Sequence, residues 1–427
     1  MRRLSLLYSC LLGVMAPAYA ENLLDVYQQA LYSDPSLKAA QLQFEISEAQ
    51  QAQAGGALLP QVSANVNLSY NYRSIDTQGS DQYKGERYSV SLTQSVIDVA
   101  KFSNWLRYQS LTDKSLADYQ QAQQILMYQV VERYFNVLAE RDSLDLSRQE
   151  ATTTEQQLEQ VKRQYEKHIV KITDVYELEA KLDSLVAGQI EIETQLDIAR
   201  QSLMELTGMP LTNMSVLLGE VQQVAALAQL NSPLIHAQNK EIQAADYDVI
   251  SQRAKHLPVV DIQLQYYNTN NGFQNSMTPV VDTKVAAINI TVPIFSGGST
   301  YQRAQEAAKQ LRISKQRKIS ILRAIEKETR DAFLSANASV KRIKAAKKAL
   351  KTAGKAREAM EKGFKYGMQS IGDVLISQSR EFSAKKDVLD AKYTYIINRV
   401  RFEQASGTLS LQSLESINQW LRVGFRT

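Results

Sequence analysis

The chain is short of the residues that most often carry covalent, redox or metal chemistry. Its 427 residues include one cysteine, Cys10, and three histidines. One cysteine cannot form a disulfide within the chain, and the histidines stand apart without the spacing of a zinc site. Glycine is also scarce, and Gly297-Gly298 is an isolated pair rather than a phosphate-binding loop. We therefore expect no enzyme active site, no metal site and no cofactor.

Neither sign of charge dominates, and long apolar runs are missing. The 49 basic and 45 acidic residues leave a net charge of +4, too balanced for a nucleic-acid-binding surface. After residue 20 the chain has no apolar stretch long enough for a transmembrane helix. Residues 1–20 begin with Arg2 and Arg3, continue with an apolar core and end at Ala18-Tyr19-Ala20. This pattern predicts a signal peptide and export.

What the chain does contain is an internal repeat. Pro35 and Pro60 recur as Pro233 and Pro258, each at an offset of 198 residues. Thr207-Gly208 recurs as Ser406-Gly407 at an offset of 199. The chain is therefore predicted to hold two copies of one unit of roughly 200 residues, far longer than a solenoid repeat.

The landmarks also predict where the copies begin and end. We place a signal peptide at 1–20, the first repeat at 21–210 and a connector at 211–231. The second repeat is placed at 232–408, and a short C-terminal segment follows at 409–427.

Each copy contains two segments in which apolar and polar residues alternate. They lie at 62–73 and 88–93 in the first copy and at 260–266 and 286–294 in the second. A period of two predicts strands with one apolar and one polar face. The first two strands are expected to be joined by a polar loop that contains Gly79 and Gly85.

A long helix is predicted after the second strand of each copy. Residues 99–166 contain no proline or glycine, and residues 299–362 contain only Gly354. Apolar positions recur at steps of three and four residues, and Asp98 and Ser296 are expected to cap the helix starts. Each helix would be roughly 100 Å long at ~1.5 Å per residue.

Shorter helices are predicted at 21–56 and 174–208. Their combined length is close to that of one long helix, so two short helices stacked end to end would flank each long one. This favours a long helical tube. A solvent-exposed antiparallel coiled coil would also explain the helices, but it would leave the four strands without a role.

Four strands with an apolar face cannot sit in lipid alone, because both sheet edges would hold unpaired backbone groups. Membrane barrels have at least about eight strands. The chain is therefore expected to oligomerise, unless its strands lie outside a membrane. Tyr70, Tyr72, Tyr88 and Tyr266 lie near predicted strand ends, where an aromatic girdle is expected. Tyrosine is also simply a good strand former.

Several short motifs occur in an order that resembles a known family. They are Glu21-Asn22-Leu23, Leu59-Pro60-Gln61, Thr93-Gln94-Ser95, Ile172-Thr173-Asp174-Val175, Pro293-Ile294-Phe295 and Asp373-Val374-Leu375. Over residues 22–410 the chain resembles the TolC-type outer-membrane efflux proteins. The resemblance implies a mixed α and β fold in which the two tandem repeats form a long α-helical barrel. Each chain would add four strands to a trimeric transmembrane β-barrel.

The same resemblance implies a passive exit duct of a tripartite efflux or type I secretion system. A homotrimer would lie in the outer membrane of a Gram-negative bacterium, in contact with its lipid, with a helical tunnel in the periplasm. Its expected partners are a periplasmic adaptor and an inner-membrane transporter of RND or ABC type, and its cargo drugs or secreted polypeptides. The alternative is a periplasmic helical-hairpin adaptor or a structural coiled-coil protein that forms no channel.

The helix breaks 165–174 and 364–373 match the closed periplasmic tip of the family. Asp373 matches an aspartate that lines the narrowest constriction, and Ile376 stands where the family often has a second aspartate. As an alternative, Asp373 would act only as a helix cap.

Asp174 matches an aspartate that ties the tip shut. Its usual partners are a tyrosine and an arginine, and the matching positions hold Phe364 and Gln369, so any link would be weaker. A capping role alone is equally open for Asp174. Gly367 is retained where adaptors dock, with His168 as its first-copy counterpart and Tyr165 beside it.

The two long helices differ in charge near this tip. Residues 341–365 hold ten basic and two acidic side chains, whereas residues 142–166 hold six acidic and three basic ones. Single surface ion pairs contribute only about 0–1 kcal/mol. Many such pairs repeated in three subunits are expected to help fix the order of the helices.

Overall fold

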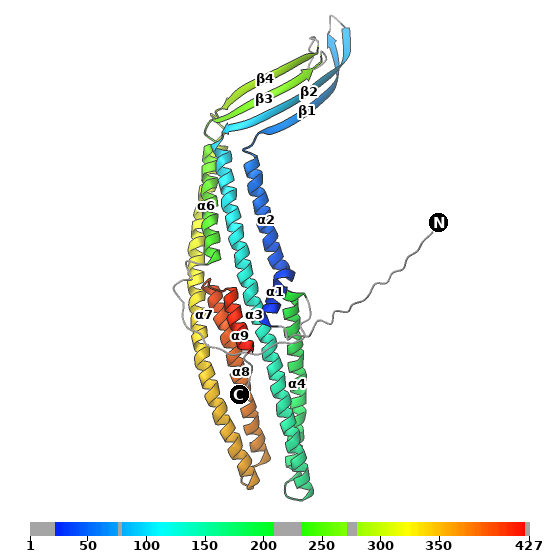
Figure 1. The fold of residues 1–427 in the computed structure, drawn as a ribbon, viewed down its shortest axis with the longest axis vertical. Coiled ribbons are helices and arrows are strands. Elements are labelled where there is room, and N and C mark those ends of the chain that lie inside the picture. Colours follow the sequence, from blue (N-terminus) through cyan, green and yellow to red (C-terminus); the bar gives the residue numbers. More distant parts are fainter. Residues whose placement is uncertain (1–21, 76–78, 209–231, 271–279, 423–427) are drawn as a thin grey trace, which may run out of the picture. The chain divides into compact units, whose positions relative to one another are not determined.

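The computed structural model describes residues 22–75, 79–208, 232–270 and 280–422. The predicted signal peptide (1–20) and the predicted connector (211–231) lie outside these residues. The chain divides into two compact units, each assembled from both repeats (Figure 1). The hairpin unit comprises Met1–Pro35, Gln123–Ala226 and Thr329–Thr427, and the sheet unit comprises Ser36–Ala122 and Leu227–Glu328.

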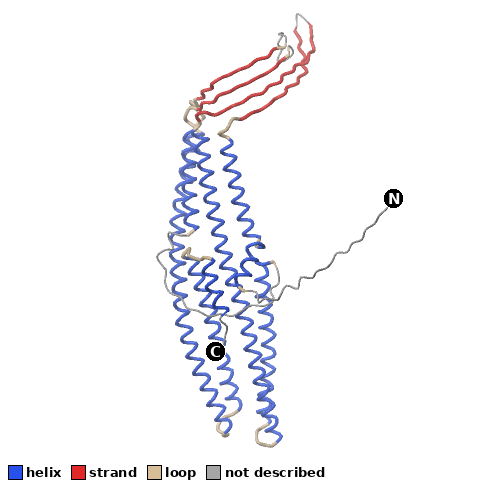
Figure 2. The backbone as a smooth tube through the Cα atoms, in the orientation of Figure 1, coloured by secondary structure: helices blue, strands red, loops and turns tan. Residues whose placement is uncertain are grey.

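The sheet unit contains one antiparallel sheet of four strands in the order β1-β2-β3-β4 (Figure 2). The strands are β1 (Gln61–Ile75), β2 (Gly79–Ile97), β3 (Val259–Thr269) and β4 (Val281–Thr291). Each copy of the repeat contributes one hairpin, and the two hairpins join through β2 and β3. The predicted mixed fold, with two strands and one long helix in each copy, is confirmed.

One face of the sheet is apolar and exposed. The register aligns Val62 with Leu92, Leu92 with Leu264, and Leu264 with Ala286, so one apolar row crosses all four strands. On the opposite face, Ser63 and its neighbour Ser91 are linked by a 2.8 Å hydrogen bond between their hydroxyls. The apolar side chains are far from buried, with 68% of Val62 exposed. The alternation therefore forms a continuous apolar surface rather than a core.

Two strand boundaries differ from the sequence prediction. The loop expected around Gly79 and Gly85 is part of β2, because the backbone there pairs with β1 as far as Ile75. Ladder hydrogen bonds do not depend on side-chain polarity, so the polar composition of this stretch did not end the strand. The last strand stops at Thr291, before Pro293, which has no N–H to give to a ladder.

Four helical segments complete the sheet unit: α2 (Pro35–Gly56), α6 (Pro233–Ala254), and the first parts of α3 (Val99–Glu166) and α7 (Ser299–Lys365). Hydrogen bonds from buried hydroxyl groups connect these helical segments to one another. Thr112 Oγ1 donates to the carbonyl of Ser47 at 3.0 Å, and Ser251 Oγ donates to that of Ala100 at 3.0 Å. Within the described residues, none of the helices is both long and apolar enough to cross a membrane.

The two predicted caps of the long helices have different outcomes. Asp98 caps α3, since its Oδ1 accepts the Lys101 N–H at 2.9 Å. The prediction for Ser296 is wrong, because α7 begins only at Ser299. Gly297 and Gly298 intervene with φ of 63° and 78°, a left-handed path that turns the chain before the helix starts.

The hairpin unit contains α1 (Leu23–Ser33), α4 (Ile172–Thr207), α8 (Ile371–Ala405), α9 (Leu411–Arg422) and the later parts of α3 and α7. Its largest fully buried side chains include Tyr134, Phe135, Leu138, Leu203, Ile396 and Leu414. Burial and the hydrogen bond to Asp142 raise the pKa of Tyr393. This tyrosine joins α8 to α3 and packs beside Phe135, with ring centroids 6.0 Å apart.

The helix predicted over 21–56 is broken in two. The break falls at Asp34, whose ψ of 118° is extended. Asp34 precedes Pro35, and the proline ring disfavours helical geometry at the residue before it. Ser33, at the end of α1, donates through its hydroxyl to the carbonyl of Leu206 near the end of α4, at 2.9 Å. The last turns of α1 and α4 are thus in direct contact.

Candidate functional site at the helix tips

Two equivalent turns close the hairpins α3–α4 and α7–α8. Helix α3 ends with the Ile169 N–H donating to the Gln164 carbonyl at 2.9 Å, and α7 ends with the Met368 N–H donating to the Gly363 carbonyl at 2.8 Å. Each turn then has one left-handed residue, His168 with φ of 59° and Gly367 with φ of 70°. The offset of 199 residues relates all three pairs of positions. The repeat therefore fixes the backbone of both turns.

The two aspartates predicted at the gate both cap the helices that follow the turns. Asp174 Oδ2 accepts the Lys171 N–H at 3.2 Å, and Asp373 Oδ2 accepts the Ser370 N–H at 3.2 Å. Asp373 also accepts from the Ser370 hydroxyl at 2.8 Å. That hydroxyl oxygen lies 3.2 Å from the Asp373 N–H, as in a capping box. Capping is thus a role that each carboxylate performs within a single chain.

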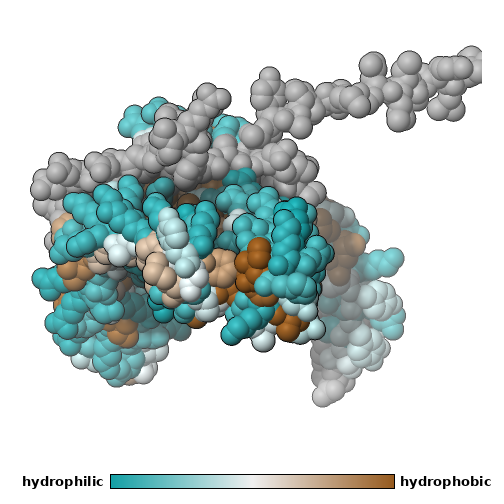
Figure 3. Space-filling view, turned by 90° about the horizontal axis from the view of Figure 1, so that it is seen from below, coloured by the Kyte–Doolittle hydropathy of each residue, from teal (hydrophilic) through white to brown (hydrophobic). Residues whose placement is uncertain are grey.

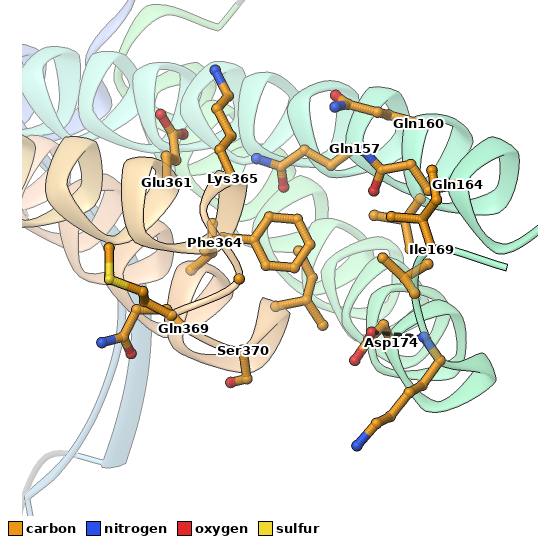
Figure 4. Close-up of a pocket in the computed structure, with 17 residues that line it drawn as sticks. Gln157, Gln160, Gln164, Ile169, Asp174, Glu361, Phe364, Lys365, Gln369 and Ser370 are labelled. Atoms are coloured by element: carbon orange, nitrogen blue, oxygen red, sulfur yellow. Dashed lines mark hydrogen bonds between the residues drawn. The ribbon is translucent and has the colours of Figure 1, made fainter. Parts of the chain in front are cut away.

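Gln369 lies against its own turn rather than against Asp174. A Cβ atom placed on Gly363 would come within 2.7 Å of Gln369 Cγ, so this side chain covers bare backbone. Figure 4 shows Gln369 and Asp174 on opposite sides of a groove, with the Phe364 ring between them. Among the described residues the structure gives Asp174 a bond to the Lys171 N–H and none to Gln369.

The groove lies between the two hairpins and has a volume of about 840 Å³. Both turns contribute to its lining, together with glutamine side chains of α3 such as Gln157 and Gln164. Its base is an apolar cluster of Leu158, Val161, Val175, Leu178, Ile371, Val374 and Leu375. This cluster packs α3 and α4 against α8, and the partly buried Phe364 joins it from α7.

The structure brings some predicted site residues together and separates others. Asp174, Phe364, Gln369 and Gly367 all line the groove. Asp373 is exposed outside the groove lining. Ile376, Tyr165 and His168 are exposed outside it as well, and 54% of Ile376 is accessible. In one chain the predicted gate residues therefore form two groups, one inside the groove and one on the surface.

A buried polar link between the hairpins was not predicted. Lys181 of α4 forms an ion pair with Glu150 of α3 at 3.0 Å, and its Nζ also donates to Ser379 Oγ of α8 at 3.3 Å. Glu150 is buried, with 9% exposed. The available signal was the spacing of Lys181, three residues after the buried Leu178, which places a charge on the packed face of α4.

The surface around the tips is mostly hydrophilic. Seen from the end that carries the turns, hydrophobic side chains are scattered among polar ones (Figure 3). No group of three or more histidine, cysteine, aspartate or glutamate side chains is placed to hold a metal ion within the described ranges. The tips thus offer charged and polar groups for contacts and for ions, without a built metal site.

Comparison with known proteins gives a match over both repeats. The family model described as outer membrane efflux protein matches residues 26–209 and 224–408. The two matched segments cover most of the chain and correspond to the two copies recognised from the sequence repeat.

Curated relatives match along nearly the whole chain. The outer membrane protein TolC of Vibrio cholerae is 29% identical over 441 residues, covering 98% of each chain. The alkaline protease secretion protein AprF of Pseudomonas aeruginosa is 26% identical over 438 residues, covering 98% of this chain and 91% of its own.

Solved structures share the fold. The outer membrane channel CmeC of Campylobacter jejuni has a TM-score of 0.81 at 19% identity, covering 95% of this chain and 91% of its own. The open-state structure of the outer membrane channel MtrE of Neisseria gonorrhoeae has a TM-score of 0.77 at 19% identity, with 91% of each chain covered.

Proposed function

The chain belongs to the outer membrane efflux protein family, and from that premise we propose that three copies form one continuous duct. The protein is an outer-membrane channel of tripartite efflux or type I secretion systems of Gram-negative bacteria, and it is not an enzyme. Family membership rules out the alternative of an adaptor or coiled-coil protein that forms no channel.

The exposed apolar face of the sheet carries the proposal. Among the described residues, the outer edges of β1 and β4 have no strand partner. Edges of this kind cannot lie in lipid, and closure into a barrel is the arrangement that removes them. If β1 of one copy pairs with β4 of the next, three copies close a barrel of twelve strands. The apolar rows would then face lipid and the serine and asparagine rows the lumen.

The strands have suitable lengths for this role. The shortest, β3 and β4, have 11 residues each, and a membrane crossing needs about 9–11. Tyr70, Tyr72, Tyr88 and Tyr266 are exposed on the same face as the apolar rows. We assign them to an aromatic girdle at a membrane–water interface.

In the trimer, we place Asp373 in a ring at the constriction of the helical tunnel. Its exposure supports this position, because the capping bonds of Asp373 occupy one oxygen, Oδ2. A ring of three carboxylates attracts cations. Ile376, one helical turn further along α8, would add an apolar ring beside it. Asp174 would act from the groove, where Phe364 and Gln369 give it no charged partner.

We assign the exposed turns to adaptor docking. Tyr165, His168 and Gly367 present two similar backbone paths at the tip, which suits a partner that contacts both hairpins in the same way. An inner-membrane transporter of RND or ABC type would supply the energy, and drugs or secreted polypeptides would be the cargo.

Conductance of single channels in planar bilayers tests the gate assignment with a matched pair of variants. Asp373→Asn and Asp174→Asn disturb equivalent 3.2 Å bonds to a backbone N–H, so the loss of these capping bonds is shared, and only Asp373 loses a further bond, to the Ser370 hydroxyl. In Asp373→Asn we expect block by a trivalent lanthanide to weaken by about tenfold, which corresponds to ~1.4 kcal/mol. Asp174→Asn should change the block much less.

Each outcome bears on a different part of the proposal. Equal lanthanide block in the wild type and in Asp373→Asn would remove Asp373 from the pore while leaving the duct intact. A purified protein that inserts into bilayers without conducting, and that stays monomeric in detergent, would overturn the trimeric duct itself.

A further inference from the structure

Helix α7 has a regular stripe of lysines on its surface near the tip. The stripe positions follow one another at alternating steps of three and four residues. They are Lys341, Lys344, Lys348, Lys351, Lys355, Glu358, Lys362 and Lys365. All eight are exposed, and we call the seven lysines the lysine stripe. Steps of three and four residues keep side chains on one face of a helix, which is the geometry of a helix–helix contact.

The lysine stripe faces away from α8. Ile343, Leu350 and Phe364 of the seam toward α8 are partly buried, and each follows a stripe lysine by two positions. Two residues correspond to about 200° around a helix, so the lysines lie on the side opposite the seam. Arg357, at a seam position, ion-pairs with Glu381 of α8. From Lys341 to Lys362 the stripe therefore forms an outer flank of the hairpin, whereas Lys365 at the end of α7 lines the groove.

Within one chain the charge of the lysine stripe is largely uncompensated. Lys362 pairs with Glu358 at 2.8 Å. Among the described residues, no other stripe lysine forms an ion pair within 4 Å. Like charges three and four residues apart on a helix repel one another. A helix of this length keeps such a stripe at a cost in stability unless an acidic surface lies against it.

Helix α3 presents an acidic flank at the same distance from its turn. Asp145, Glu159 and Glu166 are exposed at multiples of seven residues on the side away from the buried Thr154 and Leu158, and we call them the acidic stripe. Among the described residues Asp145 and Glu166 form no ion pair, and Glu159 pairs only with Arg163 of its own helix, at 3.1 Å.

The basic residues of the same part of α3 are occupied elsewhere. Arg148 pairs with Glu193 of α4 at 2.8 Å, and Lys162 pairs with Glu179 of α4 at 2.7 Å. These pairs direct the positive charge of α3 toward α4, which leaves its outer side acidic.

Packing within the chain puts the two stripes on opposite flanks. The ion pairs from Arg148 and Lys162 join α3 to α4, the bond from Lys181 to Ser379 joins α4 to α8, and Arg357 joins α8 to α7. Near the tip the helices thus follow the order α3, α4, α8, α7. Within one chain α4 and α8 lie between the two flanks, and the residues of α3 and α7 that line the groove, such as Gln157, Gln164 and Phe364, lie outside both stripes apart from Lys365.

A second copy of the chain can bring the two stripes together, because residues at equivalent positions of α3 and α7 lie at the same distance from their turns. Helices α3 and α7 both run toward the tips and end at equivalent residues, Glu166 and Lys365, at the repeat offset of 199. The same offset sets Lys344 level with Asp145. Lysine and carboxylate therefore coincide at the level of Lys344 and Asp145 when the flanks of two copies lie side by side in parallel.

We propose that the lysine stripe on α7 of one copy binds the acidic stripe on α3 of the next copy. The inference rests on the proposed trimeric duct and assigns the chemistry of its subunit contacts near the tip. Individual surface pairs are weak, but a row of them favours the pairing of unlike flanks and penalises contact between like flanks. The charge contrast thus selects α3 as the neighbour of α7.

Carbodiimide cross-linking of the full-length protein tests the contact, because this reagent joins only lysines and carboxylates that touch. In the wild type we expect covalent trimers on denaturing gels and an amide between Lys344 and Asp145 by mass spectrometry. Reversal of Lys344, Lys351 and Lys355 to Glu should lower the yield of cross-linked trimer roughly tenfold. At about 1 M salt, where the Debye length falls to about 3 Å, the wild type should show the same loss.

A charge swap and a matched control decide the outcome. Adding Asp145→Lys, Glu159→Lys and Glu166→Lys to the reversed stripe should restore the trimers. Reversal of Lys309, Lys315 and Arg317, exposed earlier on the same helix, should leave them unchanged. Cross-linked trimers that persist undiminished in the reversed stripe variant would overturn this inference while leaving the duct intact. A conducting wild type without trimers would overturn the trimeric duct instead.

Discussion

The turn between α3 and α4 and the turn between α7 and α8 follow one backbone path with different side chains. Their left-handed position holds His168 in the first and Gly367 in the second. Their N-cap position holds Lys171, which cannot accept the helix N–H groups, and Ser370, which does. The second turn thus has the residue that suits its geometry at both positions, and the first at neither. The two copies thus share the backbone path of the turn but differ in the residues that stabilise it.

Burial behind the turns differs in the same direction. Ile371 has 3% of its surface exposed and Leu375 has 7%, whereas their counterparts Ile172 and Tyr176 have 38% and 61%. The first turn of α8 is therefore part of the apolar cluster under the groove, and the first turn of α4 is partly a surface. We infer that α3–α4 is the hairpin whose tip opens more readily.

The largest expected effect comes from shortening the matched isoleucines. Ile371→Ala removes a buried side chain and should reduce the free energy of local opening of the α7–α8 tip by about 2–4 kcal/mol. Ile172→Ala removes a side chain that is already partly in solvent and should cost less than about 1 kcal/mol. Hydrogen exchange of the backbone amides in each turn, measured by mass spectrometry in detergent, gives the two values. Similar losses in the two variants would contradict the difference in burial.

Substitutions at the two left-handed positions should change the stability of the turns by less, and in opposite directions. Gly367→Ala should destabilise its turn by about 1–2 kcal/mol, because residues with a Cβ atom pay that penalty at positive φ. No atom lies within 4 Å of the added methyl group, so the cost is one of backbone conformation alone. His168→Gly should stabilise the first turn by up to about 1 kcal/mol. The same exchange measurement reports both changes, and a destabilising His168→Gly would show that the imidazole makes a contact worth more than the strain.

Much of this architecture could be predicted from the sequence because it depends on periodicity. The 99–166 helix matches α3 residue for residue, since proline and glycine are missing there and the apolar positions repeat regularly. Boundaries set by backbone alone were harder to predict. Gly85 lies inside β2 because its pairing with Ser69 continues the ladder, and Gly297 and Gly298 shift the start of α7 beyond Ser296.

The candidate site could be placed from the sequence but not described in detail. The repeat located both turns and both capping aspartates, because equivalent residues occupy equivalent positions. The contacts of Gln369 depend on how tightly a turn closes over Gly363, which composition does not reveal. The bond from Lys181 to Ser379 joins residues 198 positions apart, and such a contact follows from helix packing rather than from local pattern.

The N-cap positions offer the smallest and most direct test of the difference between the hairpins. Ser370→Ala removes the hydroxyl that accepts the Asp373 N–H and should destabilise the start of α8 by about 1 kcal/mol. Lys171→Ser supplies the missing acceptor at the start of α4, where Asp174 already bonds to the N–H of residue 171, and should gain a similar or smaller amount. Exchange rates in the first turns of α4 and α8 should therefore converge in a protein that carries both changes. Rates that remain as far apart as in the wild type would assign the difference to the buried isoleucine rather than to capping.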